Sequence, residues 1–491
     1  MTITLGGSGS ANKLRSDLAS TASTALGDAL IGVLAGGVPR TQHDKNADIV
    51  SVKDFGAKGD GSNDTEAINA ALLSTGGDVT IFFPPGGPYN LASTITLPNV
   101  NVRIMATGAT ITRATNGNIF NRVHRGKFFE MEGATFTGKG VAFKYTAPEV
   151  VGLLPFNDQY LEYRIRKCTF LQDATTYAID LYGSREGSFE SCYFENNKGI
   201  YAVYAINTDV VECHFKNTVN CIVYDHDSQG LKVVGGTALG SINGGIFNYV
   251  FGIQLLGVMW DFIDAPVLIA GCDQVVISSS YFSGRTATAV ILVTSYTLPS
   301  TTVHNTSDLH IVDCPGIICN YKTNSTALFI QNTTHFTVSG STFLGWTNKG
   351  IDFVNSSYGI ISGNTLYPEG GSTGNYGIYA DASTFSLDIN HNNTFKPIAA
   401  TLGANFISSN MGWITENHGT ATTGTGGNAY AFAHYLSQTP TLSMIQVTPI
   451  SAVQAGLTWY VSSIDATNFV ITTNVVITSA ITFAFSVRIR A

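Results

Sequence analysis

The chain has 491 residues and a formal net charge of −8, because 34 acidic residues outnumber 26 basic ones. The high apolar share, 44%, excludes intrinsic disorder, and the acidic balance argues against non-specific binding to nucleic acid or to an anionic membrane. Charged residues make up only 12% of the chain, so its surface suits a neutral or weakly charged ligand such as carbohydrate, as well as any large β protein.

Residues 13–34 carry leucines at helical spacing with polar residues between them, which predicts a short amphipathic helix that needs a partner. Residues 36–47 contain Gly, Pro and polar residues without a period and predict a linker. The most apolar early stretch, 25–38, is broken by Asp28, so we expect neither a secretory signal nor a membrane anchor.

A short strand, a Gly-rich turn and a helix follow the linker. We expect Asp64 or Thr65 to cap this helix and Ile68 and Leu72 to face inward. A further strand and turn begin at Val79.

A repeat fills residues 100–405. An aromatic or aliphatic anchor recurs at intervals of mostly 20 to 24 residues, at Phe136, Phe170, Phe194, Phe215, Leu239, Phe262, Phe282, Phe343, Leu366 and Phe395. Three short strands in a coil of about 22 residues are the period of a parallel β-helix, in which stacked coils share one core. The long interval after Phe282 predicts one or two more coils and an insertion at 295–308.

The seven cysteines contain no CxxC pair, and three of them open similar tripeptides at Cys168, Cys192 and Cys213. This indicates one structural position repeated along the chain. We expect buried, reduced thiols that pack as small hydrophobes, and no disulfide, metal site or cofactor.

The repeat ends near Asn417, and the rest of the chain alternates apolar and polar residues, which predicts short antiparallel strands. The sequence therefore predicts a mainly β chain with an N-terminal helix and linker at 1–47, a parallel β-helix at 48–416, and an antiparallel β-sandwich-like module at 417–491 that caps the stack.

Residues 50–68, Val-Ser-Val-Lys-Asp-Phe-Gly-Ala-Lys-Gly-Asp-Gly-Ser-Asn-Asp-Thr-Glu-Ala-Ile, resemble the opening of the pectate-lyase-like right-handed β-helix superfamily, as does Ile81-Phe-Phe-Pro-Pro-Gly. Together with residues 40–48, this opening is similar to tailspikes and capsule depolymerases of tailed bacteriophages. Segments 433–441, 446–449 and 459–469 resemble the terminal β module of such spikes.

The resemblance implies a homotrimeric fibre of the phage virion that binds and cleaves capsular polysaccharide or lipopolysaccharide at the bacterial surface. It implies attachment to the phage tail, baseplate or another spike, and trimerisation, by residues 1–47, with capping or trimerisation by 417–491. A helix without a partner is the alternative for the N-terminal segment. Nucleic acid and membrane insertion are not expected.

Two ladders of outward residues supply candidate chemistry. Ten residues after three successive anchors come Asp180, Tyr204 and Asp225, which predicts two carboxylates two coils apart with a sugar-stacking tyrosine between them, as an inverting glycosidase requires. Asp227 lies close to this ladder. Solvated aspartates on an ordinary outer face are the alternative.

The second ladder lies one residue before each anchor and includes Tyr193, His214, Asp261 and Tyr281. Tyr193 beside His214 suits proton abstraction next to a uronic acid, as a β-eliminating lyase requires. A packing or surface histidine is the alternative. Nearby residues that complete either mechanism are Glu212, Asp264, Arg285 as the partner of a substrate carboxylate, and Trp260 as a sugar platform or a core residue.

Acidic residues outnumber basic ones in the central coils, so hydrolysis is favoured over elimination. The candidate catalytic residues are Asp225, Asp227, Asp261, Asp180, Glu212 and His214, and the candidate substrate-binding residues are Tyr193, Tyr204, Tyr281, Arg285, Asp264 and Trp260. A polysaccharide lyase and a non-catalytic receptor-binding spike are the alternative functions. A secreted bacterial lyase is disfavoured by the expected lack of a signal segment.

Overall fold

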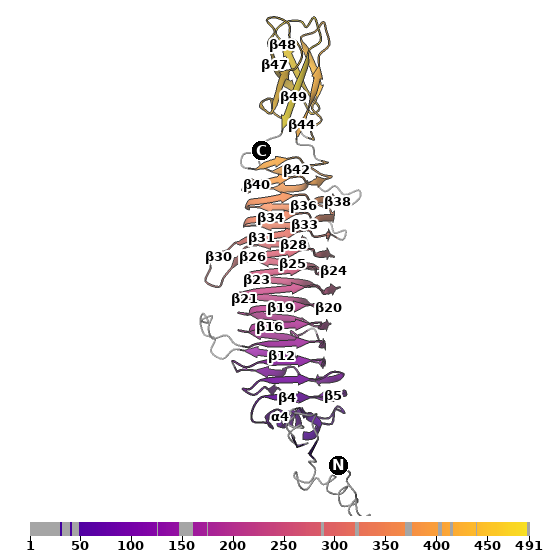
Figure 1. Cartoon of the computed structure of the whole chain (residues 1–491), viewed down its shortest axis with the longest axis vertical. Coiled ribbons are helices and arrows are strands. Elements are labelled where there is room, and N and C mark those ends of the chain that lie inside the picture. The colour runs from indigo at the N-terminus through magenta and orange to yellow at the C-terminus, as the bar shows by residue number, and fades with distance from the viewer. Residues whose placement is uncertain are drawn as a thin grey trace, which may run out of the picture.

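The computed structural model describes residues 30–31, 40–41, 49–124, 126–146, 161–173, 175–285, 289–319, 324–368, 376–400, 405–412, 416–437 and 439–488. The chain is a long rod of stacked coils, with a helix at its N-terminal end and a small β module beyond its C-terminal end (Figure 1). No helix in the described part of the chain has the length and apolar character of a membrane span.

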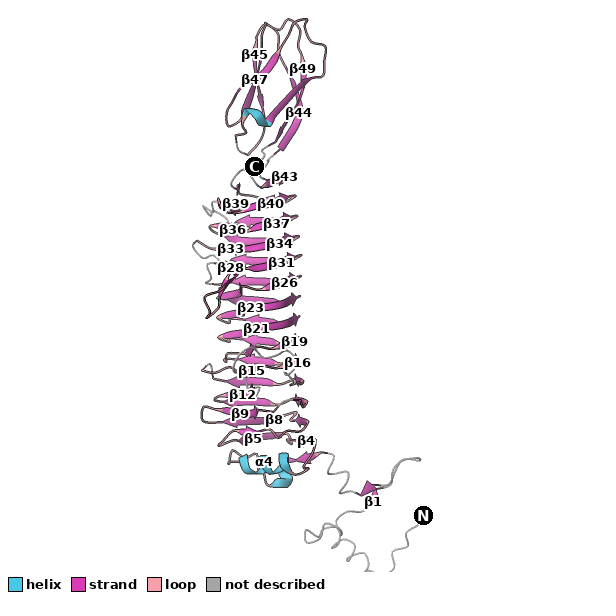
Figure 2. Ribbon diagram, turned by 90° about the vertical axis from the view of Figure 1, so that its left-hand side faces the viewer, coloured by secondary structure: helices cyan, strands magenta, loops and turns pink. Residues whose placement is uncertain are grey.

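Helix α4 (Thr65–Leu73) closes the N-terminal end of the stack, after the short 3-10 helix η1 (Val52–Phe55) (Figure 2). Its residues Ile68, Ala71 and Leu72 are buried, as expected. Asp64 is the N-cap residue, but its carboxylate accepts hydrogen bonds from the backbone N–H groups of Lys58 and Gly59 at 2.7 and 3.1 Å. Asp64 therefore fixes the Gly-rich turn instead of capping the helix through its side chain.

Each coil contributes one strand to each of three faces, and the pairing between coils is parallel throughout. The first face is made by β6 (Ile95–Thr96), β9 (Asn118–Arg122), β12 (Val141–Thr146), β15 (Ile179–Tyr182), β18 (Ile200–Val203), the starts of β21 (Asn220–Val234) and β23 (Asn243–Leu256), β25 (Ala265–Ala270), β28 (Ala289–Thr294), β33 (Thr326–Gln331), β36 (Lys349–Val354), β39 (Tyr376–Ala380) and β42 (Ile398–Ala400).

The second face follows directly along the chain. It is made by β3 (Val50–Ser51), β4 (Val79–Phe82), β7 (Val102–Met105), β10 (Phe129–Glu132), β13 (Tyr163–Arg166), β16 (Arg185–Glu190), β19 (Ile206–Val211), the ends of β21 and β23, β26 (Asp273–Ser278), β31 (Thr306–Val312), β34 (Thr333–Ser339), β37 (Ser357–Ser362), β40 (Phe385–Asn390) and β43 (Phe406–Ser408).

The third face is a separate sheet of 13 strands, one for each coil. It is made by β5 (Gly86–Asn90), β8 (Ala109–Arg113), β11 (Thr135–Gly138), β14 (Thr169–Gln172), β17 (Tyr193–Glu195), β20 (His214–Lys216), β22 (Thr237–Leu239), β24 (Met259–Ile263), β27 (Tyr281–Gly284), β32 (Gly316–Cys319), β35 (Thr342–Trp346), β38 (Thr365–Pro368) and β41 (Asn393–Thr394). The predicted parallel β-helix is confirmed.

The repeated anchor is the inward residue of the third face, where Phe170 stacks on Phe194 with ring centroids 4.6 Å apart. Three predicted anchors are wrong, because Leu239, Phe262 and Phe395 are 48%, 50% and 49% exposed. The inward positions in these coils are Ala238, Trp260 and Thr394, as the strand register shows.

Trp260 is a core residue, 1% exposed, so the prediction of a sugar platform there is wrong. Its ring needs small neighbours. A Cβ on Gly244 would lie 2.7 Å from Trp260 Cε3, and Ala238 is the residue opposite it. Strand β24 also shifts register between Trp260 and Ile263, which pushes Phe262 outward.

The repeated cysteine position is confirmed, because Cys168, Cys192 and Cys213 are buried and free. Burial raises the pKa of the Cys168 thiol to about 12. In the C-terminal coils the same turn position holds Asn364 and Asn392, which hydrogen-bond to one another at 2.9 Å. A turn position at the core boundary thus accepts thiols or amides, provided that the polar atoms find partners.

The interval between Phe282 and Phe343 holds one further inward position, Ile317. It also holds a hairpin of β29 (Tyr296–Thr297) and β30 (Val303–His304), within the predicted insertion. The hairpin projects from the side of the rod (Figure 1).

The predicted helix at 13–34 lies almost entirely outside the described residues. Two of its residues form strand β1 (Leu30–Ile31), which pairs antiparallel with β2 (Arg40–Thr41). The helix prediction is therefore wrong at residues 30–31.

The C-terminal module consists of two antiparallel sheets of three strands around one apolar core. Its elements are β44 (Glu416–Thr422), β45 (Ala429–Ala433), η2 (Leu442–Met444), β46 (Ile445–Pro449), β47 (Trp459–Ile464), β48 (Asn468–Thr473) and β49 (Thr482–Arg488).

Candidate functional site

A cluster of tyrosines and carboxylates lies on the first face near the middle of the rod. We call it the tyrosine–carboxylate patch and define it by Tyr177, Asp180, Tyr201, Asp225, His226 and Tyr296. Asp180 and Tyr201 are opposite one another on neighbouring strands, and the rings of Tyr177 and Tyr201 stack with centroids 4.8 Å apart. Lys144 Nζ lies 2.8 Å from Asp180 Oδ2.

Asp225 lies where β21 turns from the first face to the second, next to a register shift between Asp225 and Ser228. Its side chain is only 13% exposed. Asp225 Oδ1 accepts a hydrogen bond from the backbone N–H of His226 and lies 2.9 Å from His226 Nδ1. In the neutral imidazole with its proton on Nδ1, Nε2 is then an acceptor.

The hairpin supplies a hydrogen-bond donor for His226 Nε2, because Tyr296 Oη lies 3.2 Å from it. The two rings meet edge to face with centroids 5.8 Å apart. Gly271 permits this approach, since a Cβ there would lie 2.7 Å from Tyr296 Cβ. Asp225, His226 and Tyr296 thus form one chain of polar contacts between the β-helix and the hairpin.

Besides burial, the charges of Asp180 and Asp225 both raise the pKa values of Tyr177 and Tyr201. Burial raises the pKa of Tyr201 to about 12, and the charges of Asp225 and Asp180 add to the effect. The pKa of Tyr177 is raised by the same causes, burial first, although its hydroxyl accepts a hydrogen bond from Asn220. These phenols stay protonated at neutral pH and are hydrogen-bond donors.

The predicted ladder of Asp180, Tyr204 and Asp225 is wrong in register. Asp180 pairs with Tyr201, whereas Asp225 pairs with Val203. Tyr204 lies in the corner turn, with a φ of 51°. Two coil steps of about 4.8 Å and an offset of roughly 7 Å along the strand leave the aspartate backbones about 12 Å apart, which favours the wide inverting arrangement over the narrow retaining one.

Asp227 lies around the corner from Asp225, in a small pocket of about 190 Å³. Gln229, Tyr249 and Asp273 also line this pocket. Burial, followed by the charge of Asp227, raises the pKa of Tyr249.

The third face brings Tyr193 and His214 together on neighbouring strands, with Tyr281 further along the same row. Tyr193 donates a hydrogen bond to Glu195 at 3.0 Å, and His214 Nδ1 lies 2.9 Å from Thr237 Oγ1. Burial, followed by the hydrogen bond to Glu195, raises the pKa of Tyr193.

The remaining candidates do not join either group. Asp261 is wrongly placed in the Tyr193 row, because that row continues through Thr237 and Met259, and Asp261 pairs with Leu239 two positions further along the strand. Glu212 lies in an exposed turn with a φ of 49°. Arg285 and Asp264 form an ion pair at 2.7 Å, so Arg285 is already neutralised by a carboxylate.

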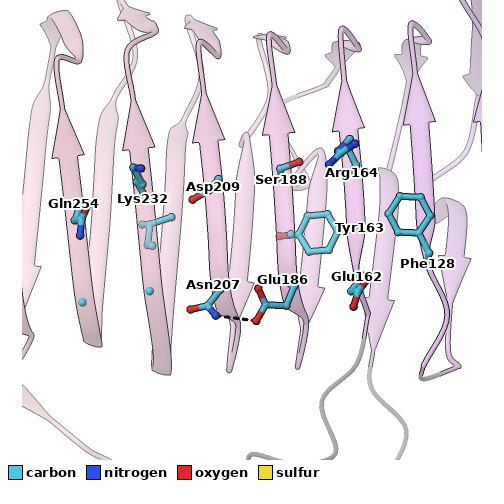
Figure 3. Close-up of a pocket in the computed structure, with 14 residues that line it drawn as sticks. Phe128, Glu162, Tyr163, Arg164, Glu186, Ser188, Asn207, Asp209, Lys232 and Gln254 are labelled. Carbon is cyan, nitrogen blue, oxygen red and sulfur yellow. Dashed lines mark hydrogen bonds between the residues drawn. The ribbon is translucent and has the colours of Figure 1, made fainter.

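A larger hollow of about 470 Å³ lies on the second face (Figure 3). We call it the hollow and define it by Glu186, Asn207, Asp209, Gly230, Lys232 and Gly252. Sequence reasoning missed it. The available signal was the pair of glycines, 22 residues apart, at the same position of two coils.

Residues 49–256 match the model of a family described as rhamnogalacturonase A/epimerase, pectate lyase-like. The tail spike protein of Shigella phage Sf6 is 42% identical over 90 residues, which cover 16% of this chain and 14% of that protein. The tail spike protein of an Escherichia phage is 49% identical over 53 residues, which cover 10% and 6%. The matched segments are thus a small part of these relatives.

Two solved structures share the fold over most of the chain. Tailspike protein 3 of bacteriophage CBA120 has a TM-score of 0.54 and 13% identity, covering 83% of this chain and 69% of that one. The tailspike protein of E. coli bacteriophage HK620, in complex with a pentasaccharide, has a TM-score of 0.52 and 11% identity, covering 98% and 100%. The parallel β-helix of this chain is therefore similar in fold to these two tailspike structures.

The parallel β-helix explains where the patch and the hollow lie. Both use outward positions of coils inside the matched range 49–256, whereas Tyr296 belongs to a hairpin beyond it. The coils supply the regular rows, and the inserted hairpin encloses one of them.

Proposed function

We propose that the chain is a phage tailspike that binds a bacterial surface polysaccharide, capsular or lipopolysaccharide, and cleaves it within the chain by glycosidic hydrolysis. The observation that carries this proposal is the convergence of Asp180 and Asp225 on the stacked rings of Tyr177 and Tyr201. Aromatic faces suit the apolar faces of sugar rings, and two carboxyls are the groups that glycoside hydrolysis uses.

The two carboxyls have different surroundings and therefore different roles. The ion pair with Lys144 holds the Asp180 side chain in place, and we assign this carboxyl the activation of the attacking water. Asp225 is more enclosed, with its Oδ1 held by His226 and its Oδ2 left to face a substrate, and we assign it the complementary role of proton donor to the glycosidic oxygen. Tyr201, between them, is the platform for the sugar ring, the role that the ladder prediction assigned to Tyr204.

Elimination at the third face is the second candidate, because Tyr193 and His214 are neighbours there. A tyrosine base needs a phenol that loses its proton readily. The raised pKa of Tyr193 and its hydrogen bond to Glu195 oppose that role, so hydrolysis remains favoured. A spike that binds glycan without cleaving it is the third candidate.

The test is incubation of the purified chain with capsular polysaccharides and lipopolysaccharides from a panel of strains. Product size and the absorbance of unsaturated uronates are followed together. We expect shorter products without new absorbance. If Asp225→Asn no longer forms these products, the reaction takes place at the patch. Products with new absorbance would instead establish a lyase, and binding without shortening would establish a receptor-binding spike.

The assembly is part of the same proposal. We place the chain on the virion tail as a homotrimer acting at the bacterial surface, attached through residues 1–47, with 48–416 as the catalytic and receptor domain and 417–491 as a capping or trimerising module. Light scattering of the purified chain is expected to give three chain masses. A single chain mass would contradict the trimer.

A further inference from the structure

The hollow on the second face exists because two coils lack a side chain at a corner position. Five successive coils place a residue with positive φ there: Glu186 (53°), Asn207 (52°), Gly230 (66°), Gly252 (77°) and Gln274 (54°). A side chain projects from this position in three of the coils, and the two glycines leave the space between them open.

The next outward row of side chains lines the hollow, and it contains both hydrogen-bond donors and acceptors. The strand register places Ser188, Asp209, Lys232 and Gln254 side by side on four successive coils. Figure 3 shows these side chains in one row above Glu186 and Asn207. Asp209 and Lys232 balance each other, so the row offers both hydrogen-bond donors and acceptors with little net charge.

Hydrogen bonds hold side chains in the wall of the hollow in place. Asn207 Nδ2 donates a hydrogen bond to Glu186 Oε1 at 2.9 Å. The buried ring of Tyr163 fills the space above Gly187, where any Cβ would collide with the ring. The hydroxyl of Tyr163 lies 3.2 Å from Thr208 Oγ1, which fixes the ring.

The small corner pocket lies close along the chain to both the hollow and the patch. Gly230 follows Asp227 by three residues and Gly252 follows Tyr249 by three, and Asp227 and Tyr249 line the small corner pocket. Three residues of extended chain span roughly 10 Å at most. A ligand that passes over the corner can therefore contact the patch and the hollow at once.

We infer that the hollow is a second saccharide-binding subsite, which takes an uncharged, hydroxyl-rich part of the same polysaccharide that the patch cleaves. This inference rests on the proposed function. A cavity with paired donors and acceptors and little net charge fits hydroxyl and acetamido groups, whereas a strongly anionic sugar would meet two carboxylates, Glu186 and Asp209, against one ammonium, Lys232. The hollow contributes binding of long glycans and not the cleavage step.

The glycine at 252 gives a direct test. Asn tolerates left-handed backbone, and Asn207 already occupies the corresponding position two coils away. A Cβ on Gly252 would have Gly230 N as its nearest neighbour, at 3.6 Å, so the backbone leaves room for the Cβ of Gly252→Asn, and Gly252 itself lines the hollow. Gly257→Asn is the matched control, because Gly257 is in the same coil, has a φ of 65°, and a Cβ on it would have no atom within 4 Å.

The experiment measures binding of intact polysaccharides from the same strain panel to the full chain in an Asp225→Asn background. We expect Gly252→Asn to weaken binding at least about tenfold and Gly257→Asn to change it less than about twofold. Equal binding by the two variants would overturn the inference. Lys232→Ala, which removes a donor of the hollow without changing the backbone, is the second variant and is expected to weaken binding if Gly252→Asn does not fold.

The two proposals fail separately. If Asp225→Asn still cleaves but Gly252→Asn binds weakly, the catalytic assignment is wrong and the hollow stands as a saccharide site. If cleavage is lost in Asp225→Asn but binding is unchanged in both Gly252→Asn and Lys232→Ala, the hollow is not a subsite. If the parent chain binds no glycan of the panel, the proposed function and the subsite are both contradicted.

Discussion

The first and third faces of the β-helix both present tyrosines and titratable groups, but they organise them differently. On the third face, Tyr193 bonds to Glu195 and His214 to Thr237, within the same strand or its neighbour. In the patch, Asp225 and His226 meet Tyr296 from a hairpin 70 residues further along the chain. Polar side chains on the face of a β-helix become a candidate site where an inserted hairpin covers them, as the hairpin with Tyr296 does in the patch.

The sharpest test of this comparison is Asp225→Asn. Loss of a general acid or base is expected to lower the rate of glycan cleavage by about 10² to 10⁴-fold. Product formation by size-exclusion chromatography measures it. Asp261→Asn on the third face is the matched control, expected within about twofold of the parent chain. Equal losses in both variants would remove the distinction between the faces.

Asp180→Asn is expected to lower cleavage by about 10²-fold, because the water would lose its activating carboxylate. Lys144 would also lose its partner at 2.8 Å, so thermal unfolding is measured alongside cleavage. Lys144→Ala separates the effects, since it keeps the carboxylate and breaks the ion pair. An unchanged rate of cleavage in Asp180→Asn would show that Asp180 is not the carboxyl that activates the water opposite Asp225.

Tyr296→Phe removes the hydroxyl that faces His226 and leaves the ring in place. As a positioning residue, Tyr296 is expected to affect kcat by about tenfold with KM nearly unchanged, and to shift the pH profile of cleavage. Tyr281→Phe on the third face is the control. An effect on KM alone would make Tyr296 a binding residue instead.

Tyr201 is expected to have a smaller effect, on stability at high pH. Its folded pKa of about 12 lies above the ordinary 10.0, so its contribution to folding is fully present below pH 10 and is lost as pH rises towards about 12. Tyr201→Phe is expected to reduce the fall in unfolding midpoint across that window and to remove one late-titrating phenol from the ultraviolet titration. An identical titration curve would show that Tyr201 ionises normally.

Tyr193→Phe and His214→Ala are expected to have the smallest effect, less than about twofold on cleavage. Both side chains lie outside the patch, where Tyr193 bonds to Glu195 in its own strand and His214 to Thr237 in the next. A large loss in either variant would reverse the comparison and favour elimination at the third face.

The cysteine and phenylalanine positions show how far sequence reasoning reached. Cys168 and Phe170 recur together in the next coils because each coil must bury the same kind of residue at the same place. The same reasoning failed at Phe262, where Trp260 fills the core and the strand bulges. The sequence pattern alone does not show which of two nearby aromatic residues, Trp260 or Phe262, is buried.

The β-helix could be predicted from the sequence, since the period of the repeat places apolar residues where stacked coils need them. Asp180 and Asp225 could likewise be chosen as candidates for chemistry. Which residues share a row became known only in the folded chain, because row membership depends on the length of every turn between two strands. The contact of Tyr296 with His226 and the opening of the hollow by two glycines also needed the fold, since both depend on contacts between coils and not on any local pattern.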